Sequence, residues 1–231
     1  MTEHTPAPAA VPASAARPDD DRARPAGSVP GTPVRPDGSG RGDAEKTRPP
    51  MGSLRFETPQ ELFLKLPQIA ELTQQRPRPG EDALAFLGRL RSSTTPEEAV
   101  TYTAFAALPQ MAVRWGYECL RLMADHLDPM ERPMMEMVAA WLAHPSTNLR
   151  QRIAREALWA PSRSPSVLLG LAVAWSGGPV APNDPMPAPL FRAPRSVNSA
   201  VLSCLARADL NRRSVYLARF IDMAETLFRV Y

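Results

Sequence analysis

The side chains most able to do acid–base or metal chemistry are the histidines, and this chain has only His4, His126 and His144. No H-x-x-x-H, H-E-x-x-H or C-x-x-C spacing occurs, and a metal site would need two or more further ligands. His126 and His144 each lie where a predicted helix ends, and a histidine there interacts with the terminal carbonyls and the helix dipole. The sequence therefore predicts no metal site and no cofactor.

The two cysteines, Cys119 and Cys204, each lie on an apolar helical stripe. Burial among apolar side chains raises the pKa of a thiol and makes it inert, so core packing is the expected role of both. The G-x-S-x-G, P-loop and G-x-G-x-x-G motifs are all missing. Acyl transfer, nucleotide hydrolysis and dinucleotide chemistry consequently have no support.

Paired carboxylates occur at 81–82 and at 97–98. Both pairs fall in the first turn of a predicted helix, where negative charge complements the helix dipole and explains them fully. We therefore predict no catalytic residue. A hydrolase with an unrecognised site remains an alternative, and it requires His126 or His144 to lie beside a carboxylate in a cleft.

Positive charge is concentrated in the C-terminal part of the chain. Residues 146–231 carry 11 basic and 5 acidic residues, whereas residues 53–145 carry 9 and 12. The densest basic stretch includes Arg150, Arg152 and Arg155, which we expect mostly on the solvent side of a helix. Such a surface can bind phosphates, so nucleic acid or another anionic surface is an alternative partner. The small net charge of +3 and the lack of a helix-turn-helix pattern favour a protein partner instead.

The elements that would position these side chains are helices. The Thr-Pro-Gln-Glu segment at 58–61 is a capping box with proline at the first helical position, and Thr-Pro-Glu-Glu at 95–98 nearly repeats it. Apolar residues follow each start at helical spacing. About nine short helices and no convincing strand are predicted. The expected fold class is all-α, as an irregular orthogonal bundle or a stack of helical hairpins.

Two of these helices are unusually apolar. Residues 167–175 are almost all apolar, which favours a central buried helix, with a single buried strand as the alternative. A Met-rich helix carries Met134 and Met135, and its apolar residues cover more than one face. Such a helix either lies centrally or offers an adaptable binding surface. Among the four tryptophans, Trp159 is the one expected at the surface, because it adjoins a proline at a helix end.

A proline-rich loop is expected over 177–194. Pro185, Pro187 and Pro189 alternate with other residues there, which favours an extended conformation. Long loops without secondary structure are uncommon in compact domains and are often functional. Two interpretations stay open. The loop straps across the helices and tucks the apolar residues at 190–191 into the core, or it binds a partner.

Residues 1–52 differ in composition from the rest of the chain. They hold ten prolines, six glycines and no Phe, Trp or Tyr, and their charges cancel. Such a segment cannot bury enough apolar surface to offset the entropy of ordering it. We predict a disordered arm here, followed by one all-α domain over 53–231. No apolar run reaches the length of a membrane span, and no apolar segment of a secretion signal occurs, so the expected location is the cytoplasm.

Two segments carry a resemblance to a known family. Residues 108–116 read Leu-Pro-Gln-Met-Ala-Val-Arg-Trp-Gly, and residues 171–178 read Leu-Ala-Val-Ala-Trp-Ser-Gly-Gly. Together they resemble an uncharacterised all-helical domain family of proteobacteria. That family often shows two adjacent tryptophans where Trp115 and Gly116 stand, so this chain departs from the pattern. The resemblance implies no activity, but it implies genes near secretion loci, including type VI secretion clusters.

These observations favour a non-catalytic helical module that binds another protein. The resemblance extends this expectation to an adaptor or accessory protein of a bacterial secretion system. The predicted partner-binding residues are the exposed aromatic, the prolines of the loop, the two methionines and the basic stretch: Trp159, Pro185, Pro187, Pro189, Met134, Met135, Arg150, Arg152 and Arg155.

Overall fold

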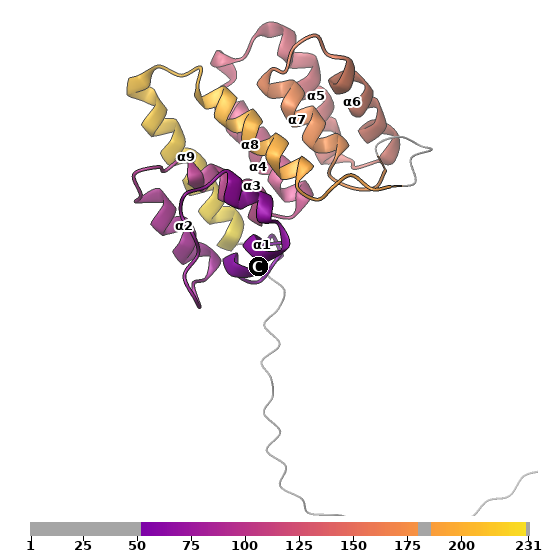
Figure 1. Ribbon diagram of the computed structural model, residues 1–231. Helices are drawn as coiled ribbons and strands as arrows, with labels where there is room; N and C mark the ends of the chain where they lie inside the picture. Colours follow the sequence, from indigo (N-terminus) through magenta and orange to yellow (C-terminus); the bar gives the residue numbers. More distant parts are fainter. Residues whose placement is uncertain (1–51, 180–185, 230–231) are drawn as a thin grey trace, which may run out of the picture. The chain divides into compact units, whose positions relative to one another are not determined.

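The computed structural model describes residues 52–179 and 186–229 (Figure 1). The arm expected over 1–52 lies outside these residues except for Gly52, and so do residues 180–185 of the expected loop. The described part contains nine α-helices and three short 3-10 helices, and it has no β-sheet, only isolated bridges. The predicted all-α class is confirmed. In chain order the helices are α1 (Pro59–Lys65), η1 (Pro67–Glu71), α2 (Ala83–Arg91), α3 (Glu98–Ala106), α4 (Pro109–Leu122), η2 (Ala124–His126), η3 (Pro129–Glu131), α5 (Arg132–Ala143), α6 (Thr147–Trp159), α7 (Pro165–Ala174), α8 (Arg192–Leu205) and α9 (Leu210–Arg229).

Capping side chains begin several helices where the sequence predicts a start. Thr58 Oγ1 accepts a hydrogen bond from the Glu61 amide at 3.2 Å, at the start of α1. Asp82, Ser146 and Ser164 cap α2, α6 and α7 in the same way. Each cap supplies an acceptor to one of the first-turn amides, which have no partner inside the helix.

The loop before α8 is shorter than predicted. Helix α8 begins at Arg192, so the loop ends at 191 and not at 194. Proline lacks an amide hydrogen, but the first turn of a helix offers no acceptor for one, so Pro194 fits there and is buried. Phe191 packs against the core, whereas Leu190 is 66% exposed. The strap interpretation is therefore right for one of the two apolar residues and wrong for the other.

Helices α7 and α8 lie at the centre of the packing. Helix α7 is buried on almost every side and contacts α4, α5, α6 and α8 (Figure 1). This confirms the helix expected over 167–175 and excludes a strand there. Gly170 allows α5 and α6 to approach α7 closely, since a Cβ there would lie 2.6 Å from Met134 Sδ and 3.3 Å from Ala157 Cβ. Helix α8 in turn contacts α3, α4 and α9.

Helix α3 is buried along its whole length and organises the remaining elements. The start of the described chain is held against its C-terminal end, where Arg55 N donates to Ala106 O at 2.8 Å. Phe86 and Tyr102 pack α2 onto α3 in an edge-to-face contact with ring centroids 4.8 Å apart. Helix α9 then contacts α2, α3 and α4. The long C-terminal helix is thereby placed beside α4, and the two helices form the groove described next.

Candidate partner-binding surface

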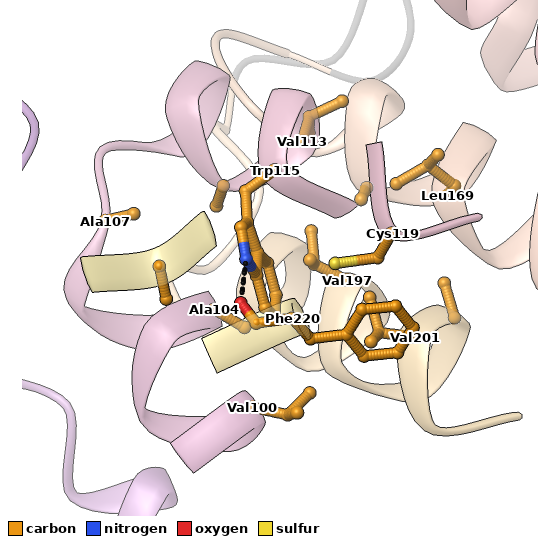
Figure 2. Close-up of a cluster of buried hydrophobic side chains, with 14 of the residues drawn as sticks. Val100, Ala104, Ala107, Val113, Trp115, Cys119, Leu169, Val197, Val201 and Phe220 are labelled. Atoms are coloured by element: carbon orange, nitrogen blue, oxygen red, sulfur yellow. Dashed lines mark hydrogen bonds between the residues drawn. The ribbon is translucent and has the colours of Figure 1, made fainter. Parts of the chain in front are cut away.

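The contact between α4 and α9 is organised by Trp115. Its indole Nε1–H donates a buried hydrogen bond to the main-chain oxygen of Phe220 at 3.1 Å (Figure 2). A buried indole N–H needs an acceptor, and here a helix carbonyl supplies it. Trp115 is only 4% exposed. The bond ties the middle of α4 to the middle of α9 and fixes the orientation of the ring between them.

A groove of about 500 Å³ opens between α4 and α9, with Trp115 in its floor. Its lining is mainly apolar and includes Leu122 from α4 and Met223 and Leu227 from α9. Leu122, the last residue of α4, is 46% exposed. The lining residues recur about three or four positions apart on each helix, so they lie along one face of each. We call this feature the α4–α9 groove.

Charged side chains of both signs border the α4–α9 groove. Arg114 and Glu118 come from α4, and Arg219 and Asp222 come from α9. Asp222 Oδ1 also lies 2.8 Å from Arg91 Nη1, in an ion pair that links α9 to α2. An apolar centre with a polar, solvent-accessible rim is the usual anatomy of a protein-binding site.

Gly116 does not face this groove. A Cβ at Gly116 would lie 3.0 Å from Val197 Cγ1 and 3.1 Å from Leu169 Cδ1, which belong to α8 and α7. A larger side chain at this position would therefore point into the core. The departure from the adjacent-tryptophan pattern removes nothing from the α4–α9 groove.

Two residues of the predicted partner-binding set are buried, so the expectation that they lie on an accessible protein-binding surface is wrong. Met134 lies in the core against Gly170. Arg150, expected at the solvent side of its helix, is 6% exposed. Helix α6 packs against α7, and the Arg150 side chain reaches the C-terminal end of α7, where Nη1 donates to Ala174 O at 3.0 Å.

The other predicted residues are accessible but do not form one site. Trp159 is 85% exposed at the end of α6. Arg152 and Arg155 are exposed on α6, and Met135 is half-buried beside a separate hollow of about 300 Å³. Pro187 and Pro189 lie on the loop and are both exposed, and Pro185 lies outside the described residues. None of those described lines the α4–α9 groove.

The groove residues were missed because the sequence places them on stripes that resemble core. A signal was nevertheless present. Helix α4 has one apolar stripe through Trp115 and Leu122 and a second through Val113 and Leu120. Two stripes are more than the usual single face of a surface helix. Helices α7 and α8 cover one side of α4, and the end of the other stripe remains open at Leu122.

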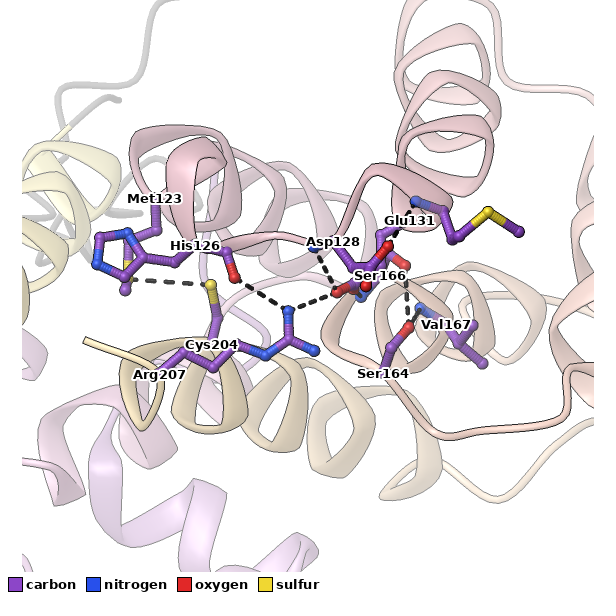
Figure 3. Close-up of polar contacts among 10 residues, drawn as sticks. Met123, His126, Asp128, Glu131, Ser164, Ser166, Val167, Cys204 and Arg207 are labelled. Carbon is purple, nitrogen blue, oxygen red and sulfur yellow. Dashed lines mark hydrogen bonds and ion pairs between the residues drawn. The ribbon is translucent and has the colours of Figure 1, made fainter.

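A polar cluster joins η3, the start of α7 and the turn that follows α8 (Figure 3). Glu131 accepts hydrogen bonds from the Ser166 amide at 3.0 Å, from the Asp128 amide at 3.3 Å and from the Arg207 guanidinium. Arg207 also donates to His126 O at 3.1 Å. Burial by itself would raise the pKa of Glu131, but the hydrogen bonds from Ser166, Arg207 and Asp128 outweigh it and lower the pKa. This carboxylate is charged and engaged in holding three elements together, so its role is structural.

Within the described residues, His126, His144 and the two cysteines do not meet in a catalytic arrangement. The His126 ring packs edge-on against Tyr216 with centroids 5.5 Å apart, and His144 is exposed at the end of α5. Neither hydrogen-bonds a carboxylate within residues 52–179 and 186–229, and no cluster there could hold a metal ion. Cys119 and Cys204 are buried as predicted, and burial raises both pKa values, that of Cys204 to about 12. The condition set for the hydrolase alternative is not met in this part of the chain.

Fold and groove together define an all-α domain with an apolar cleft between two of its helices. The chain belongs to a family of unknown function (DUF6931), whose profile matches residues 86–228. The match includes α4 and most of α9, whereas α1 and η1 precede it. No curated protein and no solved structure is significantly similar to the chain. Among the helices described, none combines the length and the apolar character needed to cross a membrane.

Proposed function

We propose that this chain is a non-catalytic helical protein-interaction module and that its partner places an amphipathic helix in the α4–α9 groove. One observation carries the proposal: an apolar groove with a tryptophan floor and an exposed leucine, bordered by charged residues. The accessible apolar side chains Leu122, Met223 and Leu227 supply the contact surface, and the buried Trp115 fixes the floor beneath them.

A helix suits this groove better than an extended peptide. The groove lies between two helices, and its lining comes from side chains rather than from free main-chain amides and carbonyls. A strand would need an open sheet edge, which the described residues do not contain. Helix-in-groove recognition instead uses apolar anchors spaced at i, i+3 or i+4 and i+7. We therefore expect a partner segment with that spacing.

The N-terminal region of the chain itself is a poor occupant for the groove. Residues 1–51 contain no Leu, Ile, Phe, Trp or Tyr. Such a segment lacks the large apolar anchors that a groove of this kind binds. A separate protein is therefore the proposed source of the helix.

The specific role that we propose is that of an adaptor or accessory protein of a bacterial secretion system, acting in the cytoplasm. This part of the proposal rests on the resemblance carried by residues 108–116 and 171–178. The first of these segments supplies Arg114 and Trp115 to the groove. Identification of the bound partner would test this role separately from the location of the binding site.

The test is affinity purification of the tagged chain from its native host, with and without nuclease, followed by mass spectrometry. Leu122→Lys removes an apolar groove residue, and Leu64→Lys is a matched control. Both leucines lie in the last turn of a helix, where lysine complements the dipole, and Leu64 is 77% exposed on α1, away from the groove. We expect nuclease-resistant partners that Leu64→Lys retains and Leu122→Lys loses.

Two outcomes would contradict the proposal. If Leu122→Lys captured the same partners as the unchanged chain, the binding surface would lie elsewhere. If all captured proteins disappeared on nuclease treatment, binding through nucleic acid would replace it. That alternative relies on exposed arginines such as Arg152 and Arg155, and the burial of Arg150 removes one member of the basic stretch.

A further inference from the structure

Arg150 is the only lysine or arginine that is buried in the described part of the chain. It lies in the first turn of α6, and its Nη1 donates to Ala174 O, at the C-terminal end of α7, at 3.0 Å. Residues 177–178 turn close beside it. Gly178 has φ of +66°, and a Cβ there would lie 3.4 Å from Arg150 Nη2. The chain thus wraps a guanidinium group away from solvent.

No carboxylate from the described residues balances this charge. The ion pairs there use other arginines, and the less buried Arg207, for example, has Glu131 as its partner. A buried charge without a counter-ion is strongly unfavourable. The hydrogen bond to a helix C-terminus compensates for part of this, because the dipole is negative there. An anion is the partner that the arrangement lacks.

A pocket of about 240 Å³ lies at Arg150, and its other polar lining carries no negative charge. Thr147 contributes a hydroxyl group and Gln110 contributes an amide. The Ser176 hydroxyl already donates to Val173 O at 2.7 Å, and Ser146 Oγ accepts from the Leu149 amide at 3.3 Å. The N-terminus of α6 points here too. Its first turn contains no acidic residue. Ser146 Oγ caps the Leu149 amide, and the amides of Thr147 and Asn148 have no acceptor inside the helix. Helix N-termini of this kind bind anions.

We propose that this pocket, the Arg150 pocket, binds a tetrahedral oxyanion of the phosphate class. The guanidinium would supply charge-assisted hydrogen bonds, and the Thr147 hydroxyl, the Gln110 amide and the first amides of α6 would supply the remaining donors. The volume is several times the roughly 30 Å³ that one water occupies in the liquid, which leaves room for such an ion. The Arg150 pocket is distinct from the α4–α9 groove, since the two share no lining residue.

The test measures binding of inorganic phosphate to the full chain by isothermal titration calorimetry, against sodium chloride at equal ionic strength. Gln110→Glu places a carboxylate among the lining residues. Because residue 110 lies in the first turn of α4, an acidic side chain there complements the dipole and the fold is retained. Arg152→Gln removes an exposed arginine from the same helix as Arg150 and serves as a control. We expect Gln110→Glu to weaken phosphate binding about tenfold or more and Arg152→Gln to leave it unchanged.

Four results would overturn the proposal. If Gln110→Glu and Arg152→Gln weakened phosphate binding equally, the affinity would depend only on the charge of the surface. Sodium acetate binding as tightly as phosphate would exclude a preference for a tetrahedral oxyanion. The third uses Asp184, which lies outside the described residues. If phosphate bound only to the Asp184→Asn variant and not to the unchanged chain, the anion of the pocket would be the chain's own carboxylate. If phosphate bound neither to the unchanged chain nor to any of the variants, the proposal would also be overturned.

Discussion

Glu131 and Arg150 show how two ionisable side chains can lie in the interior and meet different needs. Glu131 has a full set of donors, including the Arg207 guanidinium. Arg150 has a helix C-terminus and a pocket whose other polar lining carries no negative charge. Burial lowers the pKa of Arg150. For Glu131 the hydrogen bonds overcome burial and lower the pKa. Glu131 therefore has its hydrogen-bond partners within the chain, whereas Arg150 is suited to bind an additional anion.

The lowered pKa of Glu131 predicts a pH-dependent contribution to stability. A carboxyl group whose folded-state pKa lies below its unfolded value, about 4.3 for Glu, stabilises the fold above the unfolded pKa and loses this effect as pH falls through the folded pKa. We expect Glu131→Gln to lower the free energy of unfolding by about 1–3 kcal/mol at pH 7 and by less near pH ~3. Urea unfolding at both pH values measures this. The exposed Glu136→Gln on α5 is the control, and a loss that did not change with pH would refute the prediction.

Two helical glycines are expected to respond to alanine with opposite signs. At Gly88 in α2 no atom lies within 4 Å of the position that a Cβ would occupy, so Gly88→Ala should raise the free energy of unfolding by roughly 0.5–1 kcal/mol through backbone entropy. At Gly116 the Cβ would lie within 3.1 Å of branched side chains of α7 and α8. We expect Gly116→Ala to destabilise by about 1–3 kcal/mol because it overpacks the core. Thermal and urea unfolding of both variants measure these changes. If α4 did not pack this closely against α7 and α8, both substitutions would change the free energy of unfolding in the same direction.

At the scale of elements, local capping signals predict most helix starts, and the start of α8 is the exception. Caps such as Thr58 and Asp82 act on amides two or three residues away, so a short segment predicts them. The start of α8 was placed three residues too late because its first turn contains Pro194. A proline there is compatible with either a loop or a helix start. The contacts of α8 with α3, α4 and α7 favour the helix start over the loop at Pro194.

The docking of α9 against α4 depends on the Trp115 hydrogen bond. Trp115→Phe removes the indole N–H that Phe220 O accepts and leaves a small void, so we expect a loss of about 1–3 kcal/mol. Amide hydrogen exchange in α9 should become faster, since this helix loses a tie to its neighbour. The exposed Trp159→Phe is the control and should change stability by no more than about 0.5 kcal/mol. Unchanged exchange in α9 would show that other contacts hold the helix in place.

At the scale of the whole molecule, the large apolar side chains of Leu, Ile, Phe, Trp and Tyr all lie beyond residue 51. The first 51 residues contain none of these five types. We expect deletion of residues 1–51 to leave the melting temperature and the urea midpoint unchanged, because the deleted segment has too few apolar groups to contribute to a core. A clear drop in either midpoint would show that this segment contributes to the stability of the domain.

The all-α class and the positions of most helix starts were determined by the sequence alone, since periodicity, caps and prolines act within a few residues. The burial of Cys119 and Cys204 also followed from helical stripes. Tertiary structure decided which face of each helix is covered. Arg150 and Arg152 lie on the same helix, yet only the first of them is buried where α6 packs against α7. The α4–α9 groove likewise exists because α9 reaches α4 from about a hundred residues away, and such long-range packing leaves no local mark in the sequence.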